Sequence, residues 1–266
     1  MSSSGTSRWG LRVLGLGYLT LLLLAPLVMI FYKTFEHGIA PPLDAITSPD
    51  GLHALKLTLL MVAIAVPLNT VFGIGCALLL VRHRGRGSAL IDAVINLPFA
   101  ISPVVIGLSL FLLYGTGGWL GPTLSEAGIK VLFSVPGMVL ASVFVSLPFV
   151  VRETVPVLQE IGTDQESAAS TLGANAWQTF WRITLPAIRW GVAYGVVLTT
   201  ARVLGEFGAV TIVSGSISGQ TQTLPLFVEK EFTNFNLPGA YGASILLALL
   251  ALSTLLAMNL LKRKEA

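Results

Sequence analysis

Long apolar runs, separated by shorter polar segments, dominate the pattern of hydrophobic and polar positions along the chain. A transmembrane helix needs about 20 mostly apolar residues. Six stretches satisfy this condition, at about 11–32, 57–81, 89–113, 131–151, 190–213 and 239–261. The first is too long for a cleaved signal peptide, and no small-residue cleavage site clearly follows it. The pattern therefore predicts an all-α integral membrane protein, a single domain over residues 1–266 with six transmembrane helices.

The composition agrees with this prediction. Of the 266 residues, 54% are hydrophobic and 11% are charged, whereas a soluble globular domain has about 25% charged residues. The single cysteine, Cys76, lies in an apolar run and has no second cysteine for an intrachain disulfide, so we expect a packing role. The three histidines, His37, His53 and His83, lie outside the predicted spans, which excludes a histidine proton relay at mid-membrane.

The distribution of lysine and arginine predicts the orientation, because cytoplasmic loops carry an excess of these residues. If the N-terminus is inside, eleven basic residues are inside, four are outside, and Arg202 lies within a span. The inside set is Arg8, Arg12, Arg82, Arg84, Arg86, Arg152, Arg182, Arg189, Lys262, Arg263 and Lys264, and the outside set is Lys33, Lys56, Lys130 and Lys230. We therefore expect both termini and a loop over about 152–189 in the cytoplasm.

Several predicted spans contain proline, at Pro26, Pro67, Pro98, Pro103, Pro136 and Pro148. Each proline removes a backbone hydrogen bond, a loss that lipid tolerates only where neighbouring helices, side chains or water satisfy the free carbonyl group. The pattern favours kinked helices around a pathway, most clearly at Pro98 and Pro103. The alternative is that proline is simply common in membrane helices.

The predicted cytoplasmic loop contains a short helix. The segment Thr163-Asp-Gln-Glu166 has capping-box spacing, and its acids suit the positive end of a helix dipole. Gly173 is placed to end the helix. A helix of about nine residues is marginal alone in water, so we expect it to dock on a partner. Its compact docking surface would be formed by Ala168, Ala169 and Leu172.

A second amphipathic stretch follows. At helical spacing its apolar face comprises Trp177, Phe180, Trp181, Leu185 and Ile188, with Arg182 and Arg189 off that face. Tryptophan and arginine at the entrance of a span suit the headgroup region of a membrane. The stretch therefore belongs to the docking loop or only anchors it at the interface.

Four segments resemble the permease subunits of ABC importers. They are Asp164-Gln-Glu-Ser-Ala-Ala-Ser-Thr-Leu-Gly-Ala, Arg182-Ile-Thr-Leu-Pro-Ala-Ile-Arg-Trp-Gly, Leu198-Thr-Thr-Ala-Arg-Val-Leu-Gly-Glu-Phe-Gly-Ala-Val and Leu97-Pro-Phe-Ala-Ile-Ser-Pro-Val-Val-Ile-Gly. The first two are similar to the EAA…G…I-x-L-P coupling loop of that family. The last, with Ser214-Gly-Ser-Ile, is similar to the CysW-type sulfate/thiosulfate permeases. The resemblance covers essentially the whole chain, with one departure: Ser167 stands where the family has glutamate, and the acid is one place earlier at Glu166.

The resemblance implies a type I ABC importer permease (MetI-like) fold in the inner membrane. It also implies a CysT-like second permease, two ATPase subunits that bind ATP and Mg²⁺, and an extracytoplasmic sulfate-binding protein. This chain would then be no enzyme, would bind no cofactor and no nucleic acid, and would contact membrane lipid. The residues that the resemblance assigns to ATPase coupling are Asp164, Gln165, Glu166, Ala168, Ala169, Leu172 and Gly173.

A charged pair lies inside the fifth predicted span. Arg202 and Glu206 are four residues apart, so their side chains can meet on one helix face. One interpretation is a structural or gating pair. The other places Arg202 near the anion route, since a guanidinium group matches oxyanions. Gly205 and Gly208 would permit close helix approach. Further candidates for the gate or anion pathway are Ser102, Pro103, Thr199 and Thr200, although a hydroxyl in a span more often bonds to its own helix.

The segment at about 214–238 is predicted outside the cell, with a flexible polar start and a short amphipathic piece. It suits either a surface that meets a binding protein or an ordinary connecting loop.

The chain lacks a Gly-Lys dipeptide and the common metal and hydrolase motifs, so we expect no P-loop, no metal site and no enzyme. The rival interpretations are a molybdate or tungstate permease of the same class and an ion-coupled secondary transporter. The latter would need internal repeats and titratable groups at mid-membrane. A structural scaffold would leave the Ile183-x-Leu-Pro186 spacing unexplained.

Overall fold

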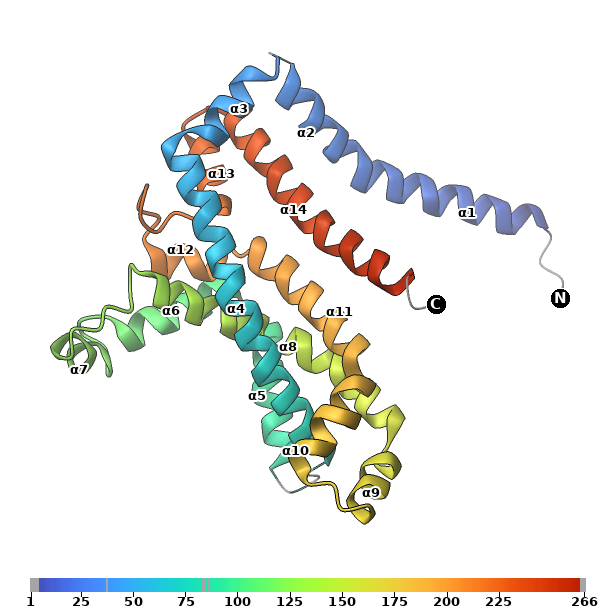
Figure 1. The fold of residues 1–266 in the computed structure, drawn as a ribbon. Helices are drawn as coiled ribbons and strands as arrows, with labels where there is room; N and C mark the ends of the chain where they lie inside the picture. Colours follow the sequence, from blue (N-terminus) through green and yellow to red (C-terminus); the bar gives the residue numbers. More distant parts are fainter. Residues whose placement is uncertain (1–4, 37, 83–84, 86, 264–266) are drawn as a thin grey trace.

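The computed structural model of the chain describes residues 5–36, 38–82, 85 and 87–263. Several residues named above lie outside this part: His37, His83, Arg84, Arg86 and Lys264. Every regular element in the described part is helical, which confirms the all-α class (Figure 1). The elements are α1 (Gly5–Leu19), the π-helical turn η1 (Thr20–Leu24), α2 (Ala25–Phe35), α3 (Ala40–Thr47), α4 (Pro49–Arg82), α5 (Ser88–Ala100), α6 (Pro103–Tyr114), α7 (Gly121–Glu126), α8 (Val135–Ile161), α9 (Asp164–Thr171), α10 (Ala176–Thr179), the π-helical turn η2 (Phe180–Thr184), α11 (Leu185–Leu204), α12 (Gly208–Ser214), α13 (Leu224–Thr233) and α14 (Leu237–Arg263).

Five helical stretches in the described part are long and apolar enough to cross a membrane: Arg12–Phe35, Pro49–Arg82, Val135–Ile161, Ala176–Leu204 and Leu237–Asn259. The predicted span 89–113 is not one helix, because α5 and α6 are bent by 110° at the break between them. The cause is local. Pro103 disfavours helical geometry in the residue before it, and Ser102 has φ −59° and ψ 136°. Six spans result if this broken pair counts as one.

The fifth predicted span, 190–213, also needs correction. Its helical stretch begins at Ala176 and ends at Leu204, and a break of three residues separates it from α12. Gly205 caps the helix with φ −94° and ψ 11°, and glycine has a low helix propensity. Glu206 therefore lies in a break between two helices, and Arg202 lies in the last turn of α11.

The centre of the molecule is a three-helix core of α4, α8 and α11, which pack against one another. Glycine makes the closest approaches possible. A Cβ atom added at Gly73 of α4 would lie 2.6 Å from Cβ of Val150, and one added at Gly195 of α11 would lie 2.7 Å from Cα of the same residue. Val150 on α8 is fully buried between the two glycines. Small residues at helix interfaces of this kind are typical of membrane bundles.

Proline occupies two kinds of position in the helices. Pro67 and Pro148 lie inside α4 and α8, which run continuously past them. Pro26 and Pro186 each follow a π-helical turn, and the N–H group of Leu185 donates to the carbonyl of Phe180, five residues back. A proline ring clashes with the carbonyl group four residues before it, and the wider π turn relieves that clash.

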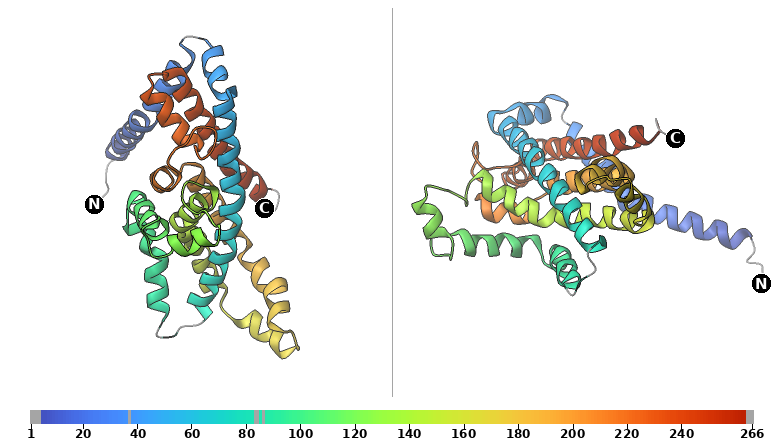
Figure 2. Two further views of the ribbon diagram at one scale, coloured as in Figure 1. Left: turned by 90° about the vertical axis from the view of Figure 1, so that its left-hand side faces the viewer. Right: turned by 60° about the horizontal axis from the view of Figure 1, so that its bottom comes forward.

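The two ends of the bundle differ. The short helices α9 and α10 lie at one end, and α3 and α13 lie at the other (Figures 1 and 2). Helices α6 and α12 pack side by side between these ends, with α7 beyond them. The N-terminal helix α1 extends beyond the rest of the molecule, while α2 packs on α14 (Figure 1).

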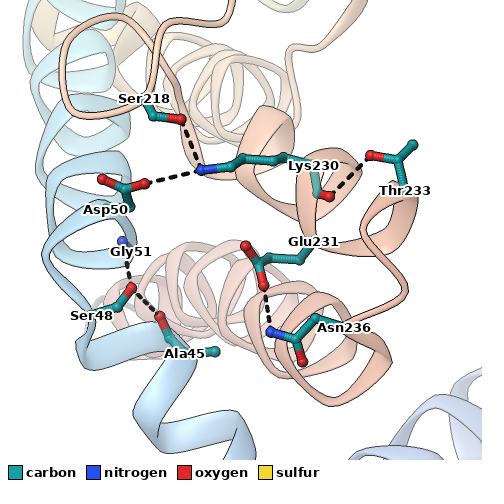
Figure 3. A network of polar contacts seen from close by, with 9 residues as sticks. All are labelled: Ala45, Ser48, Asp50, Gly51, Ser218, Lys230, Glu231, Thr233 and Asn236. Carbon is teal, nitrogen blue, oxygen red and sulfur yellow. Dashed lines mark hydrogen bonds and ion pairs between the residues drawn. The ribbon is translucent and has the colours of Figure 1, made fainter.

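The polar start of the segment at 214–238 is held by hydrogen bonds and not flexible as predicted, and the predicted amphipathic piece is helical. It forms α13, which packs on α14 and α4. Lys230 Nζ lies 3.0 Å from Asp50 Oδ2 and donates to Ser218 Oγ at 2.8 Å (Figure 3). Thr221 is 4% exposed and donates to the carbonyl group of Ser214. Thr221 Oγ1 also accepts from the N–H group of Ile217, so this hydroxyl group satisfies two backbone groups of the polar start.

Candidate functional site

The first candidate site is α9, the predicted docking helix. It spans Asp164–Thr171, so its eight residues agree with the predicted length of about nine. Thr163 precedes it, but its side chain makes no capping hydrogen bond in the described structure. The predicted capping box is therefore wrong. The physical reason is competition, since Glu166 binds groups from two other segments.

The C-terminal end of α9 agrees with the prediction. Gly173 has φ +87°, a left-handed conformation that favours glycine. Its N–H group donates to the carbonyl of Ser170 at 3.0 Å, and the N–H group of Ala174 donates to that of Ala169 at 3.0 Å. This pair of bonds is a Schellman motif, which satisfies the last carbonyl groups of the helix.

The predicted docking surface is only partly present. Leu172 is 88% exposed, and Ala168 is also exposed. Ala169 is instead buried against the protein. The exposed face of α9 therefore includes Ala168 and Leu172 together with the polar residues Asp164, Gln165, Ser167 and Thr171.

Glu166 points inward, where it joins α9 to α4 and η2. Its Oε2 atom lies 3.1 Å from Arg82 Nε, and its Oε1 atom accepts from Arg82 Nη2 at 3.1 Å. Thr184 Oγ1 donates to the same Oε1 at 2.8 Å. Thr184 is buried in the π turn before Pro186, so the Ile-x-Leu-Pro motif helps to present this hydroxyl group.

The predicted apolar face after α9 does not form as one face. Trp177, Phe180 and Trp181 form an aromatic cluster with ring centroids 5.5–6.4 Å apart, and both tryptophans are at least half exposed. Ile188 is fully buried on the other side of the π turn. The extra residue in that turn rotates the following helix away from the cluster. Exposed tryptophans of this kind suit a membrane interface.

Sequence reasoning missed the capping box that α10 does have. Asn175 Oδ1 accepts from the N–H group of Gln178 at 2.9 Å, and Gln178 Oε1 accepts from the N–H group of Asn175 at 3.0 Å. The Asn-x-x-Gln spacing was a usable signal. The partner of Glu166 carried no such signal, since Arg82 is far away in sequence.

The second candidate site is the charged pair beside the break after α11. Arg202 Nη1 lies 2.7 Å from Glu206 Oε2, so the two side chains meet as their spacing predicts. The Glu206 side chain is 2% exposed, and its Oε1 atom accepts from the N–H group of Ala209 at 2.9 Å. The carboxylate thus fastens the start of α12 to the end of α11.

A small cavity of about 10 Å³ lies next to Glu206. Ser142 and Thr223 also line it, and their hydroxyl groups have no hydrogen-bond partner among the described residues. This volume is close to the minimum for one water molecule. Because sulfate is much larger, the carboxylate side of the pair is closed to an anion in this conformation.

The two helix breaks contact each other. A Cβ atom added at Gly208, at the start of α12, would lie 3.1 Å from Cβ of Pro103, at the start of α6. The predicted close approach is therefore present at Gly208. At Gly205 the nearest atom of the described part is the carbonyl oxygen of Ala201 at 3.6 Å, so Gly205 makes no such approach.

The hydroxyl-bearing candidates Ser102, Thr199 and Thr200 differ in exposure and in hydrogen bonding. Ser102 is exposed at the break before α6. Thr200 donates to the carbonyl group of Val196 at 2.7 Å, the common back-bond within a helix. Thr199 is fully buried, and its hydroxyl has no partner among the described residues.

The chain is similar to known transport proteins. It matches the family of binding-protein-dependent transport system inner membrane components over residues 69–266. It is 52% identical to the sulfate transport system permease protein CysW of Synechocystis sp. over 254 residues, 96% of this chain and 92% of that protein. It is 36% identical to the sulfate transport system permease protein CysT of Escherichia coli over 247 residues, 93% of this chain and 89% of that protein.

Solved structures share the fold. A chain of a bacterial alginate ABC transporter superposes with a TM-score of 0.82 at 18% identity, covering 97% of this chain and 94% of that chain. A chain of the MetNI methionine ABC transporter, in an inward-facing conformation, gives a TM-score of 0.61 at 17% identity, covering 81% and 95%. These likenesses confirm the predicted importer permease fold. Given the family match over residues 69–266 and the 52% identity to a CysW protein, the chain belongs to the binding-protein-dependent transport system inner membrane components, among the CysW-type permeases.

Proposed function

We propose that this chain is one of two permease subunits of an ATP-driven sulfate importer and that α9 is its coupling helix. The observation that carries the proposal is the exposed face of α9 at one end of the bundle, with Leu172 88% exposed. Leu172 and Ala168 are exposed within the segment that resembles the family's coupling loop, and so short a helix is marginal unless it docks on a partner. The sulfate cargo is supported by the name of the Synechocystis relative at 52% identity.

The proposed assembly follows from the same family. A CysT-like permease would complete the pore, and two ATPase subunits would bind ATP and Mg²⁺. An extracytoplasmic binding protein would deliver the anion. The exposed coupling residues would be Asp164, Gln165, Ala168 and Leu172, with Glu166, Ala169 and Gly173 holding the helix in place. The excess of basic residues on the α9 side supports both termini in the cytoplasm.

We assign Arg202 and Glu206 to a gate beside the pathway, together with Ser102 and Pro103. The gate role is favoured over direct anion binding because Glu206 is 2% exposed and fastens α12 to α11. The two helix breaks touch at Pro103 and Gly208, so α6 and α12 would move together. Broken helices near a substrate route are common in transporters.

The test is ATPase activity and uptake by the reconstituted complex, with binding protein loaded with sulfate, thiosulfate or molybdate. We expect the sulfate-loaded protein to stimulate both activities. Leu172→Asp should abolish stimulation, because it places a charge on the proposed docking face. Gln159→Asp, which adds the same charge at an exposed position of α8, is the control and should leave stimulation intact.

The other outcomes separate the rival functions. Stimulation by molybdate alone would replace the cargo and keep the coupling helix. Uptake by this chain without any ATPase subunit would refute the importer and support an ion-coupled transporter. Normal stimulation in the Leu172→Asp complex would refute α9 as the coupling helix.

A further inference from the structure

Arg82, the last residue of α4, joins three separate segments of the chain. Its Nη2 atom donates to the carbonyl oxygen of Gly162 at 2.7 Å, and its Nη1 atom donates to that of Leu158 at 3.3 Å. Both carbonyl groups lie at the C-terminal end of α8, where a cation is favoured by the helix dipole. The same guanidinium group contacts Glu166 of α9 through Nε and Nη2.

The contact is more than a surface ion pair. The Arg82 and Glu166 side chains are 14% and 22% exposed, and the guanidinium contacts both carboxylate oxygens. Only the Nη2 contact is a hydrogen bond, whereas Nε lies within ion-pair distance of Oε2 and makes no hydrogen bond with the described residues. Thr184 Oγ1 donates a second hydrogen bond to the carboxylate from η2. Exposed ion pairs contribute little to stability, but a largely buried pair with further hydrogen bonds resists separation.

Glu166 and Leu172, which caps the C-terminal end of α9, point in different directions. Leu172 is exposed, whereas Glu166 is turned toward α4. A displacement applied at the exposed side would therefore be carried by Glu166 to Arg82. Arg82 belongs to α4, which forms the central core with α8 and α11. A shift of α9 would thus reach the core through side chains held at hydrogen-bond distance.

We propose that Arg82 is the positioning residue that transmits the movement of α9 to α4 and α8. The contacts involved are those of Arg82 with Glu166 and with the carbonyl groups of Leu158 and Gly162, together with the hydrogen bond from Thr184 to Glu166. The inference rests on the proposed function, because it takes α9 as the coupling helix. It goes beyond the role of Arg82 as a positive charge that orients the protein in the membrane, a role that any basic residue would fill.

The experiment uses the full reconstituted importer and measures three quantities. They are retention of the ATPase subunits during purification, ATP hydrolysis, and sulfate uptake per ATP hydrolysed. The variants are Arg82→Lys, Arg82→Gln, Glu166→Gln and the Arg82→Gln/Glu166→Gln double variant. Glu160→Gln, which neutralises an exposed glutamate in the last turn of α8, is the control.

We expect Arg82→Gln and Glu166→Gln each to lower uptake per ATP about tenfold, because each leaves a largely buried charge without its ion-pair partner. ATPase retention should stay normal, since Leu172 is untouched. The double variant should lose little more than either single variant, because both remove one interaction. Arg82→Lys keeps the positive charge and the membrane orientation but loses the planar group that reaches Glu166 and both carbonyl groups at once, so it should also reduce uptake per ATP.

Two results would overturn the inference. Normal uptake per ATP in Arg82→Lys and Glu166→Gln would reduce Arg82 to an orienting charge. Additive losses in the double variant would mean that the two residues act independently. A failure of the proposed function can be told apart from a failure of this inference. If α9 is not the coupling helix, the Leu172→Asp complex will retain its ATPase subunits and show normal stimulation.

Discussion

The contact of Gly73 with Val150 predicts a measurable difference between two glycines on the same helix. A Cβ atom at Gly73 would lie 2.6 Å from Cβ and 2.7 Å from Cγ1 of Val150. Non-bonded carbon atoms prefer separations of about 3.5–4.0 Å, so Gly73→Ala must force the two helices about 1 Å apart. Val150 cannot retreat, because Gly195 of α11 presses on its backbone from the other side.

The magnitude follows from two opposing terms. Overpacking a close-packed core costs about 1–3 kcal/mol, and the trapped position of Val150 places Gly73→Ala at the upper end. Replacing glycine by alanine in a helix gains up to about 1 kcal/mol. The net expectation for Gly73→Ala is a loss of about 2 kcal/mol. At about 2–4 °C per kcal/mol, the unfolding temperature should fall by roughly 4–8 °C.

Gly75 provides the matched control. In the described structure no atom lies within 4 Å of a Cβ added there, so Gly75→Ala should be neutral or slightly stabilising. The assay is the thermal unfolding midpoint of the purified complex, followed by loss of the monodisperse peak in size-exclusion chromatography after heating. Equal midpoints for the two variants would refute the packing argument, and so would a higher midpoint for Gly73→Ala than for the wild type.

Three further predictions address other parts of the molecule. Arg202→Ala leaves the 2% exposed carboxylate of Glu206 without its partner, which costs about 3 kcal/mol. We expect it to abolish uptake, and normal uptake by a well-folded variant would contradict both the gating and the anion-route interpretations. Asn175→Ala removes the capping box of α10 at a cost of about 1 kcal/mol, which limited proteolysis of the loop would detect as faster cleavage. Phe235 is 88% exposed with φ +60°, so Phe235→Gly should raise the unfolding midpoint by relieving about 1 kcal/mol of backbone strain.

The candidate site was predictable where its signals are local. The end of α9 at Gly173 was predictable because the left-handed turn there depends on the glycine itself and on no residue distant in sequence. The pairing of Arg202 with Glu206 was predicted from their separation of four residues, although Glu206 lies in the break after α11 and not on the same helix. The capping box at Thr163 had the right spacing and still did not form. Glu166 instead binds Arg82, a residue 84 positions away, and sequence spacing carries no information about such a partner.

The sequence by itself determined which segments lie in lipid and which in water, and therefore the fold class. Lipid provides no hydrogen-bond partners, so an apolar run of sufficient length must become a helix wherever it stands. The sequence also favours the two breaks, through Pro103 and Gly205, but only the tertiary structure decided what each break packs against. The breaks at Ser102 and Gly205 are stable because α6 and α12 pack against each other at Pro103 and Gly208. Burial of Glu206 likewise depends on helices that meet only in the folded chain, since neighbours distant in sequence set its environment.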